Sequence, residues 1–252
     1  MYAIFLTGTA GSGKSLLTSI LAPWYAGKGS SVITVNLDPG VVSLPYAPDV
    51  DIRDYIDIDE LMERYQLGPN GALVLSADMI ATKLPEIQEQ IDSINPDYAI
   101  MDTPGQLELF AYRESGAYLV KNISADARMV IFLFDSALVS TPSNFVSVAL
   151  LAASIRLRLG APQVAVLSKK DLVGDAWRKI MRWSSNRAYL EDELSKEVDS
   201  ETYLLSKRII ADLAKTDLTY ELIPVSAVTS EGIVELSASI TRILRGGEEV
   251  ED

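Results

Sequence analysis

The stretch Gly8-Thr9-Ala10-Gly11-Ser12-Gly13-Lys14-Ser15 fits the pattern G-x-x-x-x-G-K-[ST] at every defined position. It follows an apolar segment, residues 2–7, which predicts a buried strand, and it leads into residues 14–27, which predict a helix. A glycine-rich loop between a strand and a helix is the setting in which this pattern binds nucleotide phosphates. A chance glycine-rich turn is the alternative, and the pattern and its setting together disfavour it.

The residue types of this loop suit an anion. Glycines let the backbone wrap around phosphates, and the amide N–H groups of residues 11–16 face the anion at the positive end of a helix. Lys14 is expected to reach the β- and γ-phosphates, and the Ser15 hydroxyl is expected to bind Mg²⁺. The loop alone selects neither ATP nor GTP. The predicted phosphate-binding residues are Gly8, Gly11, Ser12, Gly13, Lys14, Ser15 and Leu16.

Strand and helix patterns alternate along most of the chain. This alternation predicts an α/β protein with the three-layer P-loop NTPase fold, in which helices cover both faces of a mostly parallel sheet. Ligands of such sheets bind at the carboxyl ends of the strands. Further strands are expected at residues 31–36, 98–102, 128–135, 163–168 and 218–225, and a long helix at residues 143–158.

A long interval separates the second and third expected strands. It is too long for a plain loop, and we therefore expect a helical insertion at about residues 52–96. Its helical patterns cover residues 59–65 and 77–94, and the sequence Gly-Pro-Asn-Gly at residues 68–71 separates them.

A second insertion is expected at about residues 172–217, where Trp177 and Trp183 lie in charged helical patterns. Both insertions are assigned to a single domain, residues 1–246. The acidic tail, residues 247–252, is expected to be disordered because four of its six residues are acidic.

The composition excludes several kinds of chemistry. The chain has no cysteine and no histidine, so disulfides, thiolate zinc sites and histidine bases are excluded. The remaining carboxylates, amides, lysines and hydroxyls suit Mg²⁺ and phosphates. A formal net charge of −13 makes direct nucleic-acid binding a poor expectation. No apolar run approaches the ~18 residues of a membrane span, so we expect a cytoplasmic protein without a membrane partner.

Two further segments follow expected strands and carry acidic residues. In Asp102-Thr103-Pro104-Gly105-Gln106, Asp102 is expected to hold Mg²⁺, Gly105 to approach the γ-phosphate and Gln106 to orient water. Asp38 ends the second strand and is expected to contact the Mg²⁺ shell or polarise the attacking water, since no histidine base is available. An ordinary Pro-Gly turn is the alternative for each aspartate.

Base recognition is predicted at the ends of the last two strands. Ser168-Lys169-Lys170-Asp171 stands where GTPases carry Asn-Lys-x-Asp, with Ser168 in place of the asparagine. Asp171 would accept hydrogen bonds from guanine N1 and its 2-amino group, which adenine lacks, and the Lys169 stem would cover the base. After Ser226, the backbone N–H of Ala227 would meet guanine O6. A charged and solvated loop is the alternative.

With these motifs the chain resembles the GPN-loop GTPases, and the naming tripeptide is Gly68-Pro69-Asn70. The resemblance covers nearly the whole chain and implies a homodimer in which the Gly-Pro-Asn loop of one subunit enters the active site of the other. It implies that Asn70 contacts the γ-phosphate or the leaving phosphate in trans, and that Gln106 and Asp38 position the water. Eukaryotic relatives assist RNA polymerase assembly, which suggests a protein client of that kind.

Neighbouring dimeric families carry an additional lysine where this chain has Thr9, so the amide of Asn70 would replace a lysine in trans. The predicted function is a Mg²⁺-dependent homodimeric GTPase acting as a switch or assembly factor. A nucleotide-gated scaffold with negligible turnover, a small-molecule kinase and an ATPase remain as alternatives. The predicted catalytic residues are Lys14, Asp38, Asn70, Asp102 and Gln106, and the predicted metal ligands are Ser15, Asp38 and Asp102.

Overall fold

The computed structural model describes residues 1–213 and 221–246. Within them, seven strands form one sheet: β1 (Tyr2–Gly8), β2 (Val32–Asn36), β3 (Val50–Asp51), β4 (Tyr98–Asp102), β5 (Ala127–Asp135), β6 (Gln163–Ser168) and β7 (Leu222–Pro224). The helices are α1 (Lys14–Ala26), α2 (Ile58–Tyr65), α3 (Pro69–Met79), α4 (Leu84–Ile94), α5 (Leu107–Phe110), α6 (Glu114–Asn122), α7 (Pro142–Leu159), α8 (Trp177–Ser185), α9 (Arg187–Glu197), α10 (Ser200–Leu213) and α11 (Ile233–Leu244). Short 3-10 helices occupy Ile52–Asp54, Ile80–Lys83 and Lys170–Ala176.

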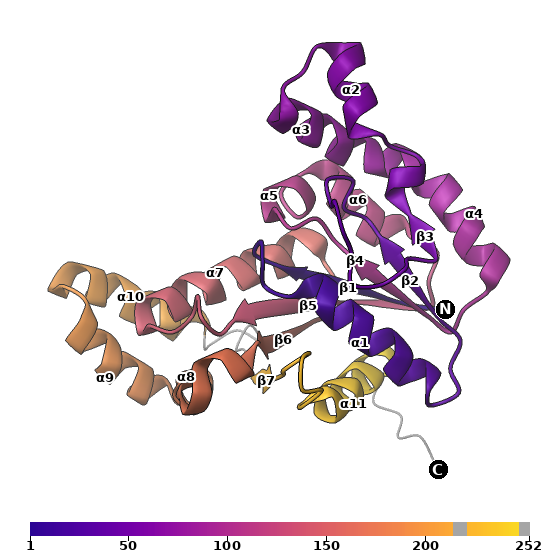
Figure 1. The fold of residues 1–252 in the computed structure, drawn as a ribbon. Coiled ribbons are helices and arrows are strands. Elements are labelled where there is room, and N and C mark those ends of the chain that lie inside the picture. The colour runs from indigo at the N-terminus through magenta and orange to yellow at the C-terminus, as the bar shows by residue number, and fades with distance from the viewer. Residues whose placement is uncertain (214–220, 247–252) are drawn as a thin grey trace.

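The sheet is parallel at every strand pairing among the described residues, and its order is β3-β2-β4-β1-β5-β6-β7. Parallel neighbours require crossover connections, and helices provide most of them here (Figure 1). Strand β1 lies at the centre, with Tyr2 opposite Tyr98 on one side and Ala127 on the other. All carboxyl ends of the strands therefore meet at one edge.

Side chains of β1 alternate between two buried cores. Ala3 and Phe5 belong to the core that also contains apolar residues of α4, α6 and α7. Ile4 and Leu6 belong to the core shared with α1 and α11. All four are fully buried, and burying a phenylalanine or leucine side chain stabilises the fold by about 1.5–3 kcal/mol. Helices thus cover both faces, and the predicted three-layer P-loop NTPase fold is confirmed (Figure 1).

The helical insertion after β2 differs from the expectation at its start and in its middle. Strand β3 was not predicted, because two residues are too few to produce a period. Gly68 separates two helices as predicted, but α3 begins directly at Pro69, so residues 69–76 are helical although no helix was predicted there. The single helix predicted at residues 77–94 was wrong, because the 3-10 helix Ile80–Lys83 divides it. Gly68 is the N-cap, and proline is favoured in the first turn because the helix needs no N–H from that residue.

The last expected strand is shorter than predicted. Only Leu222–Pro224 pair with β6, at Ala165 to Leu167, and residues 218–220 lie outside the described residues, as does the predicted tail at residues 247–252. The described part of the second insertion is helical, as expected, and forms α8, α9 and α10 at the left of Figure 1. No helix among the described residues is both long and apolar enough to cross a membrane.

Replacing Gly232 with alanine is expected to lower the free energy of unfolding by about 3 kcal/mol. Gly232 precedes α11 with φ +82°, and a Cβ there would lie 2.1 Å from the carbonyl oxygen of Pro224. Overpacking costs about 1–3 kcal/mol and a left-handed non-glycine residue about 1–2 kcal/mol. Urea unfolding would measure the loss. Gly160→Ala is the control, because Gly160 has φ +64° and no heavy atom within 4 Å of its added Cβ; equal losses in both variants would contradict the prediction.

Candidate nucleotide site

The phosphate loop connects the carboxyl end of β1 to α1. Gly13, the N-cap of α1, has φ +96°, a conformation that glycine adopts without steric cost. The backbone N–H of Ser12 donates to the carbonyl of Thr9 at 3.1 Å and closes the loop. The loop has therefore the strand–loop–helix setting that its sequence predicts.

Lys14 is buried and folds back over this loop. Its Nζ donates to the carbonyl oxygens of Gly8 and Thr9, each at 3.1 Å. Burial lowers the pKa of Lys14, whereas the charges of Asp102 and Asp38 act in the opposite direction. The two aspartates predicted to be catalytic thus lie within electrostatic reach of Lys14.

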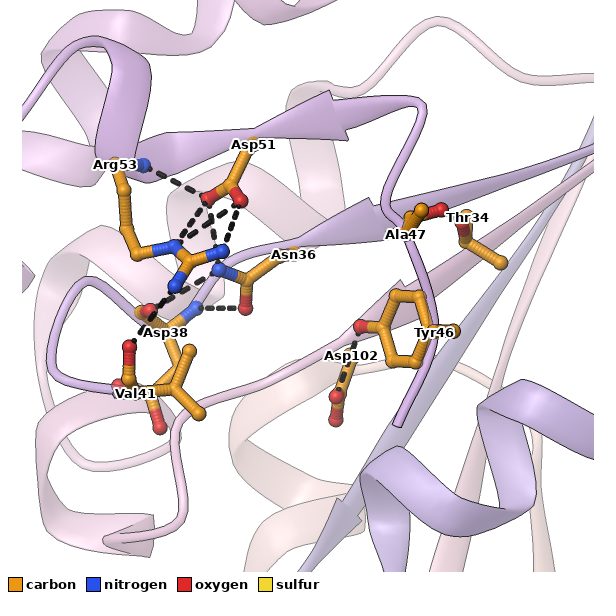
Figure 2. A network of polar contacts seen from close by, with 9 residues as sticks. All are labelled: Thr34, Asn36, Asp38, Val41, Tyr46, Ala47, Asp51, Arg53 and Asp102. Carbon is orange, nitrogen blue, oxygen red and sulfur yellow. Dashed lines mark hydrogen bonds and ion pairs between the residues drawn. The ribbon is translucent and has the colours of Figure 1, made fainter. Parts of the chain in front are cut away.

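Asp102 ends β4 and is 2% exposed. The hydroxyl of Tyr46 donates to its Oδ2 at 3.0 Å (Figure 2). Burial raises the pKa of Asp102, and the hydroxyls of Ser15 and Tyr46 together with the charge of Lys14 oppose that rise. Sequence reasoning missed Tyr46, because it lies in an irregular segment between β2 and β3 where no motif distinguishes it.

Mg²⁺ fits the donors around Asp102. The Oδ1 atom of Asp102 is buried and makes no hydrogen bond to any described residue, which is costly for a carboxylate oxygen. A hard cation would satisfy that oxygen, and the Ser15 hydroxyl interacts with the same carboxylate. The described residues contain no group of three or more acidic side chains able to hold a metal. Phosphate oxygens and water would therefore supply the other ligands.

Asp38 links two turns at the same edge. Its Oδ1 accepts from the N–H of Gly40 at 2.9 Å, and its Oδ2 accepts from the N–H of Gly105 at 3.2 Å. The predicted contact of the Gly105 amide with the γ-phosphate would require this second bond to open. Gln106 is exposed and lines, with Thr9 and its neighbours, a cavity of about 290 Å³ beside the phosphate loop. Asp38 therefore contacts residues 102–106, which we call the switch segment, and Gln106 of that segment lies beside the phosphate loop.

A second cavity, of about 190 Å³, adjoins the other side of the phosphate loop. Its lining residues come from the phosphate loop and from the ends of β6 and β7, where the sequence predicts recognition of the base. Asp171 and Leu172 are exposed on its wall. The lining residues are Ser12, Gly13, Leu16, Leu17, Ser168, Lys169, Asp171, Leu172, Val225, Ala227 and Val228. Seven predicted nucleotide-binding residues therefore meet at one pocket.

Two residues at the carboxyl end of β6, Ser168 and Lys169, connect this pocket to neighbouring segments. The Ser168 hydroxyl donates to the carbonyl of Ser12 at 2.8 Å, so the serine that replaces asparagine still contacts the phosphate loop. The Nζ of Lys169 forms an ion pair with Asp135 at 2.7 Å. Sequence reasoning missed Asp135, although its position as the last residue of β5 is a signal that could have identified it.

The Ser226-Ala227 segment lies beside the same pocket. Ser226 is fully buried, and its Oγ accepts from the N–H of Thr229 at 3.1 Å. Lys170 forms an ion pair with Glu231 at 2.6 Å, and its backbone N–H donates to Val225 at 3.3 Å. These contacts hold the two base-recognition segments together.

Asn70 lies away from this assembly. It is exposed in the first turn of α3, on the arm that α2 and α3 form at the top of Figure 1. Among the described residues, its side chain makes no recorded hydrogen bond, and it lines neither cavity beside the phosphate loop. Asn70 is therefore the one predicted catalytic residue that the single chain does not bring to the phosphate loop.

Comparisons with known proteins identify relatives that are named as nucleotide-binding proteins. A family model described as "Conserved hypothetical ATP binding protein" matches residues 6–246. GPN-loop GTPase 1 of Dictyostelium discoideum is 33% identical over 243 residues, which are 94% of this chain and 60% of that protein. GPN-loop GTPase PAB0955 of Pyrococcus abyssi is 37% identical over 194 residues, covering 76% of this chain and 74% of that protein.

A solved structure agrees with these sequence matches. The crystal structure of PAB0955, described as a GTPase in apo form from Pyrococcus abyssi, has a TM-score of 0.83 and 32% sequence identity to this chain. The match covers 96% of this chain and 97% of that chain. The description of the family model mentions ATP, whereas the relatives are named GTPases, so the base that the pocket selects becomes the decisive question.

Proposed function

Because this chain belongs to the GPN-loop GTPase family, we propose that it is a Mg²⁺-dependent, homodimeric enzyme that hydrolyses GTP to GDP and phosphate. Membership of this family makes GTP binding and hydrolysis the expected activity. The observation that carries the proposal is the pocket in which Lys169 and Asp171 meet Ser12 and Gly13 of the phosphate loop. Residues predicted to recognise the base and residues predicted to bind the phosphates line this same pocket.

The phosphate end of the site would act mainly by positioning and charge neutralisation, as phosphoryl transfer requires. The backbone N–H groups of residues 11–16 would hold the phosphates, and Lys14 would exchange its two carbonyl partners for phosphate oxygens. Ser15 and Asp102 would hold Mg²⁺, which supplies positive charge against the β- and γ-phosphate oxygens.

Water in line with the γ-phosphate would be oriented by Gln106 and Asp38. Asp38 accepts two backbone hydrogen bonds, and the one from Gly40 would still direct its carboxylate after the Gly105 N–H has turned to the γ-phosphate. Neutral side chains and one carboxylate suffice, because a loose transition state needs little proton abstraction.

We assign the remaining catalytic group to a second copy of the chain. Asn70 is exposed on the α2–α3 arm and makes no recorded contact with its own phosphate loop among the described residues. In a homodimer its amide could donate to a phosphate oxygen and accept from water. Loss of the γ-phosphate would then release the switch segment and shift the dimer between two states. A protein client such as an RNA polymerase assembly intermediate suits a cytoplasmic switch of this kind.

Replacing Asp171 with asparagine is expected to remove most of the preference for GTP over ATP. Wild-type protein should bind GTP about 100-fold more tightly, because hydrogen bonds to a charged acceptor contribute about 1.5–3 kcal/mol. An amide cannot accept from both guanine donors, so we expect Asp171→Asn to bring the two affinities within about tenfold. Displacement of a fluorescent GDP analogue by GTP and by ATP would measure both constants.

Asp175→Asn is the matched control, since Asp175 is exposed in the same 3-10 segment and pairs only with Arg178 in the recorded contacts. Equal affinity of the wild type for GTP and ATP would contradict the guanine assignment and favour an ATPase. Phosphate release without an acceptor distinguishes hydrolysis from a kinase. Stoichiometric retention of GTP without phosphate release would instead indicate a nucleotide-gated scaffold.

A further inference from the structure

A buried asparagine fixes the backbone of Asp38. Asn36 is the last residue of β2 and is fully buried. Its Oδ1 accepts from the N–H of Asp38 at 3.0 Å, and its Nδ2 donates to the carbonyl of Asp38 at 3.2 Å. One side chain therefore satisfies both backbone polar groups of the residue that is proposed to orient water.

The same amide nitrogen reaches a second buried side chain. Nδ2 of Asn36 donates to Oδ1 of Asp51 at 2.8 Å, from β2 to the neighbouring strand β3 (Figure 2). Burial alone would raise the pKa of Asp51, but hydrogen bonds from Arg53 and Asn36 together lower it. Asp51 is therefore an ionised and buried acceptor, which is stable only while its partners remain in place.

Arg53 completes the network from the start of the helical arm. Its Nε lies 3.0 Å from both carboxylate oxygens of Asp51, and its Nη2 lies 2.6 Å from Oδ2. Its Nη1 donates to the carbonyl of Val41 at 3.1 Å. The turn at residues 38–41 is thus held at its first residue by Asn36 and at its last by Arg53.

We infer that Asn36, Asp51 and Arg53 are positioning residues that set the orientation of the Asp38 carboxylate for hydrolysis. The inference deepens the proposed function and rests on the role given there to Asp38. Strand β3 has only two residues and pairs with β2 only at Val50 and Asp51, so backbone pairing alone fixes little of this segment. The side chains of Asn36 and Arg53 instead bond to the turn at residues 38–41. That turn carries the Asp38 carboxylate, which contacts Gly105 of the switch segment. Fully satisfied buried networks specify one local geometry.

The inference also connects the arm with the site. Arg53 lies in the 3-10 helix Ile52–Asp54, which leads into α2 and α3. A shift of this arm would move the guanidinium and with it the carbonyl of Val41, because both contacts depend on the same planar group. The orientation of Asp38 would thereby respond to the position of the helix that carries Asn70.

Two variants test this inference: Arg53→Lys, which keeps the charge but loses the planar fork, and Asp51→Asn, which keeps the shape but loses the charge. In each, kcat for phosphate release is expected to fall about tenfold, while the affinity for a fluorescent GTP analogue stays within twofold. Hydrogen exchange at the amide of Gly40 should become faster, since it donates to Asp38. Arg187→Gln is the matched control, because Arg187 forms an ion pair of similar exposure with Glu191 on α9.

A double variant separates positioning from a general structural effect. If Arg53 acts through the Asp38 carboxylate, adding Arg53→Lys to Asp38→Asn should lower kcat no further. A full additional tenfold loss would overturn the inference, as would wild-type kcat in Arg53→Lys while Asp38→Asn is slow. If Asp38→Asn itself kept wild-type kcat, the proposed role of Asp38 would fall together with the inference. If neither Arg53→Lys nor Asp51→Asn kept the wild-type unfolding transition, the network would belong to the fold, and the inference would be rejected.

Discussion

Replacing Lys14 with alanine is expected to lower kcat/KM for GTP hydrolysis by roughly 10²–10³. In this structure the buried ammonium already has two carbonyl acceptors, Gly8 and Thr9, at the position where phosphates are expected. Its charge acts in a site shielded from water, where an interaction with phosphate oxygens is stronger than at the surface. Alanine removes that charge and leaves the two carbonyl groups without their donor. Phosphate-release kinetics and titration of a fluorescent GDP analogue would measure the loss.

Lys28→Ala is the control for this prediction. Lys28 follows the end of α1 and lies with its Nζ 4.8 Å from the Trp24 ring centre, at the opposite end of the same helix. It should keep wild-type activity and nucleotide affinity. A Lys14→Ala protein that unfolds like the wild type yet retains kcat/KM within about threefold would contradict the role given to Lys14.

Replacing Asn70 with alanine is expected to lower kcat about 100-fold while leaving GTP affinity nearly unchanged. The amide lies on the exposed arm, so it should act only when a second subunit brings it to the γ-phosphate. A mixing experiment tests that arrangement. The heterodimer combines one Asn70→Ala subunit with one Lys14→Ala subunit. If Asn70 acts in trans, one of its two sites has both an intact Lys14 and an intact Asn70. If Asn70 acts within its own subunit, neither site has both.

In that heterodimer the site of the Asn70→Ala subunit receives its amide from the Lys14→Ala subunit. About half of the wild-type rate per dimer is expected to return, although neither homodimer is active. Asn122→Ala is the control, since Asn122 is an exposed amide at the end of α6, shortly before the amino end of β5 and away from the carboxyl ends of the strands. No recovered activity in purified heterodimers would reject the contribution in trans.

The sequence predicted the fold because local signals agreed with the tertiary structure. Five of the six expected strands were found within about one residue of their bounds, since buried parallel strands are apolar along their length, whereas the last was found only at Leu222–Pro224. The phosphate loop was predictable because its glycines are required by backbone geometry. The start of α3 was not, because Gly68-Pro69 is as compatible with a helix start as with a turn, and packing of the arm decides between them.

The candidate site was predictable where a motif lies at a strand end, and unpredictable where side chains meet through the fold. Ser168 and Asp171 were predicted because Ser168 ends β6 and Asp171 follows it within three residues. Tyr46 and Arg53 were not found, because their partners, Asp102 and Asp51, are selected by tertiary position. An aspartate and an arginine two residues apart in the sequence predict no particular contact. Only the structure shows that Asn36 lies beside Asp51.

The position of β1 in the sheet also has a consequence for how the protein is made. Gly8 pairs with Leu133, which is synthesised about 125 residues later, so a ribosome adding roughly 5–20 residues per second leaves β1 without this neighbour for roughly 6–25 seconds. Pairing with β4 comes earlier, at Leu6 and Asp102. The residues proposed to contact the base, at the ends of β6 and β7, emerge later still. During synthesis, a nucleotide could therefore meet a formed phosphate cradle before any base pocket exists, and discrimination between GTP and ATP would begin only once the last strands have joined the sheet.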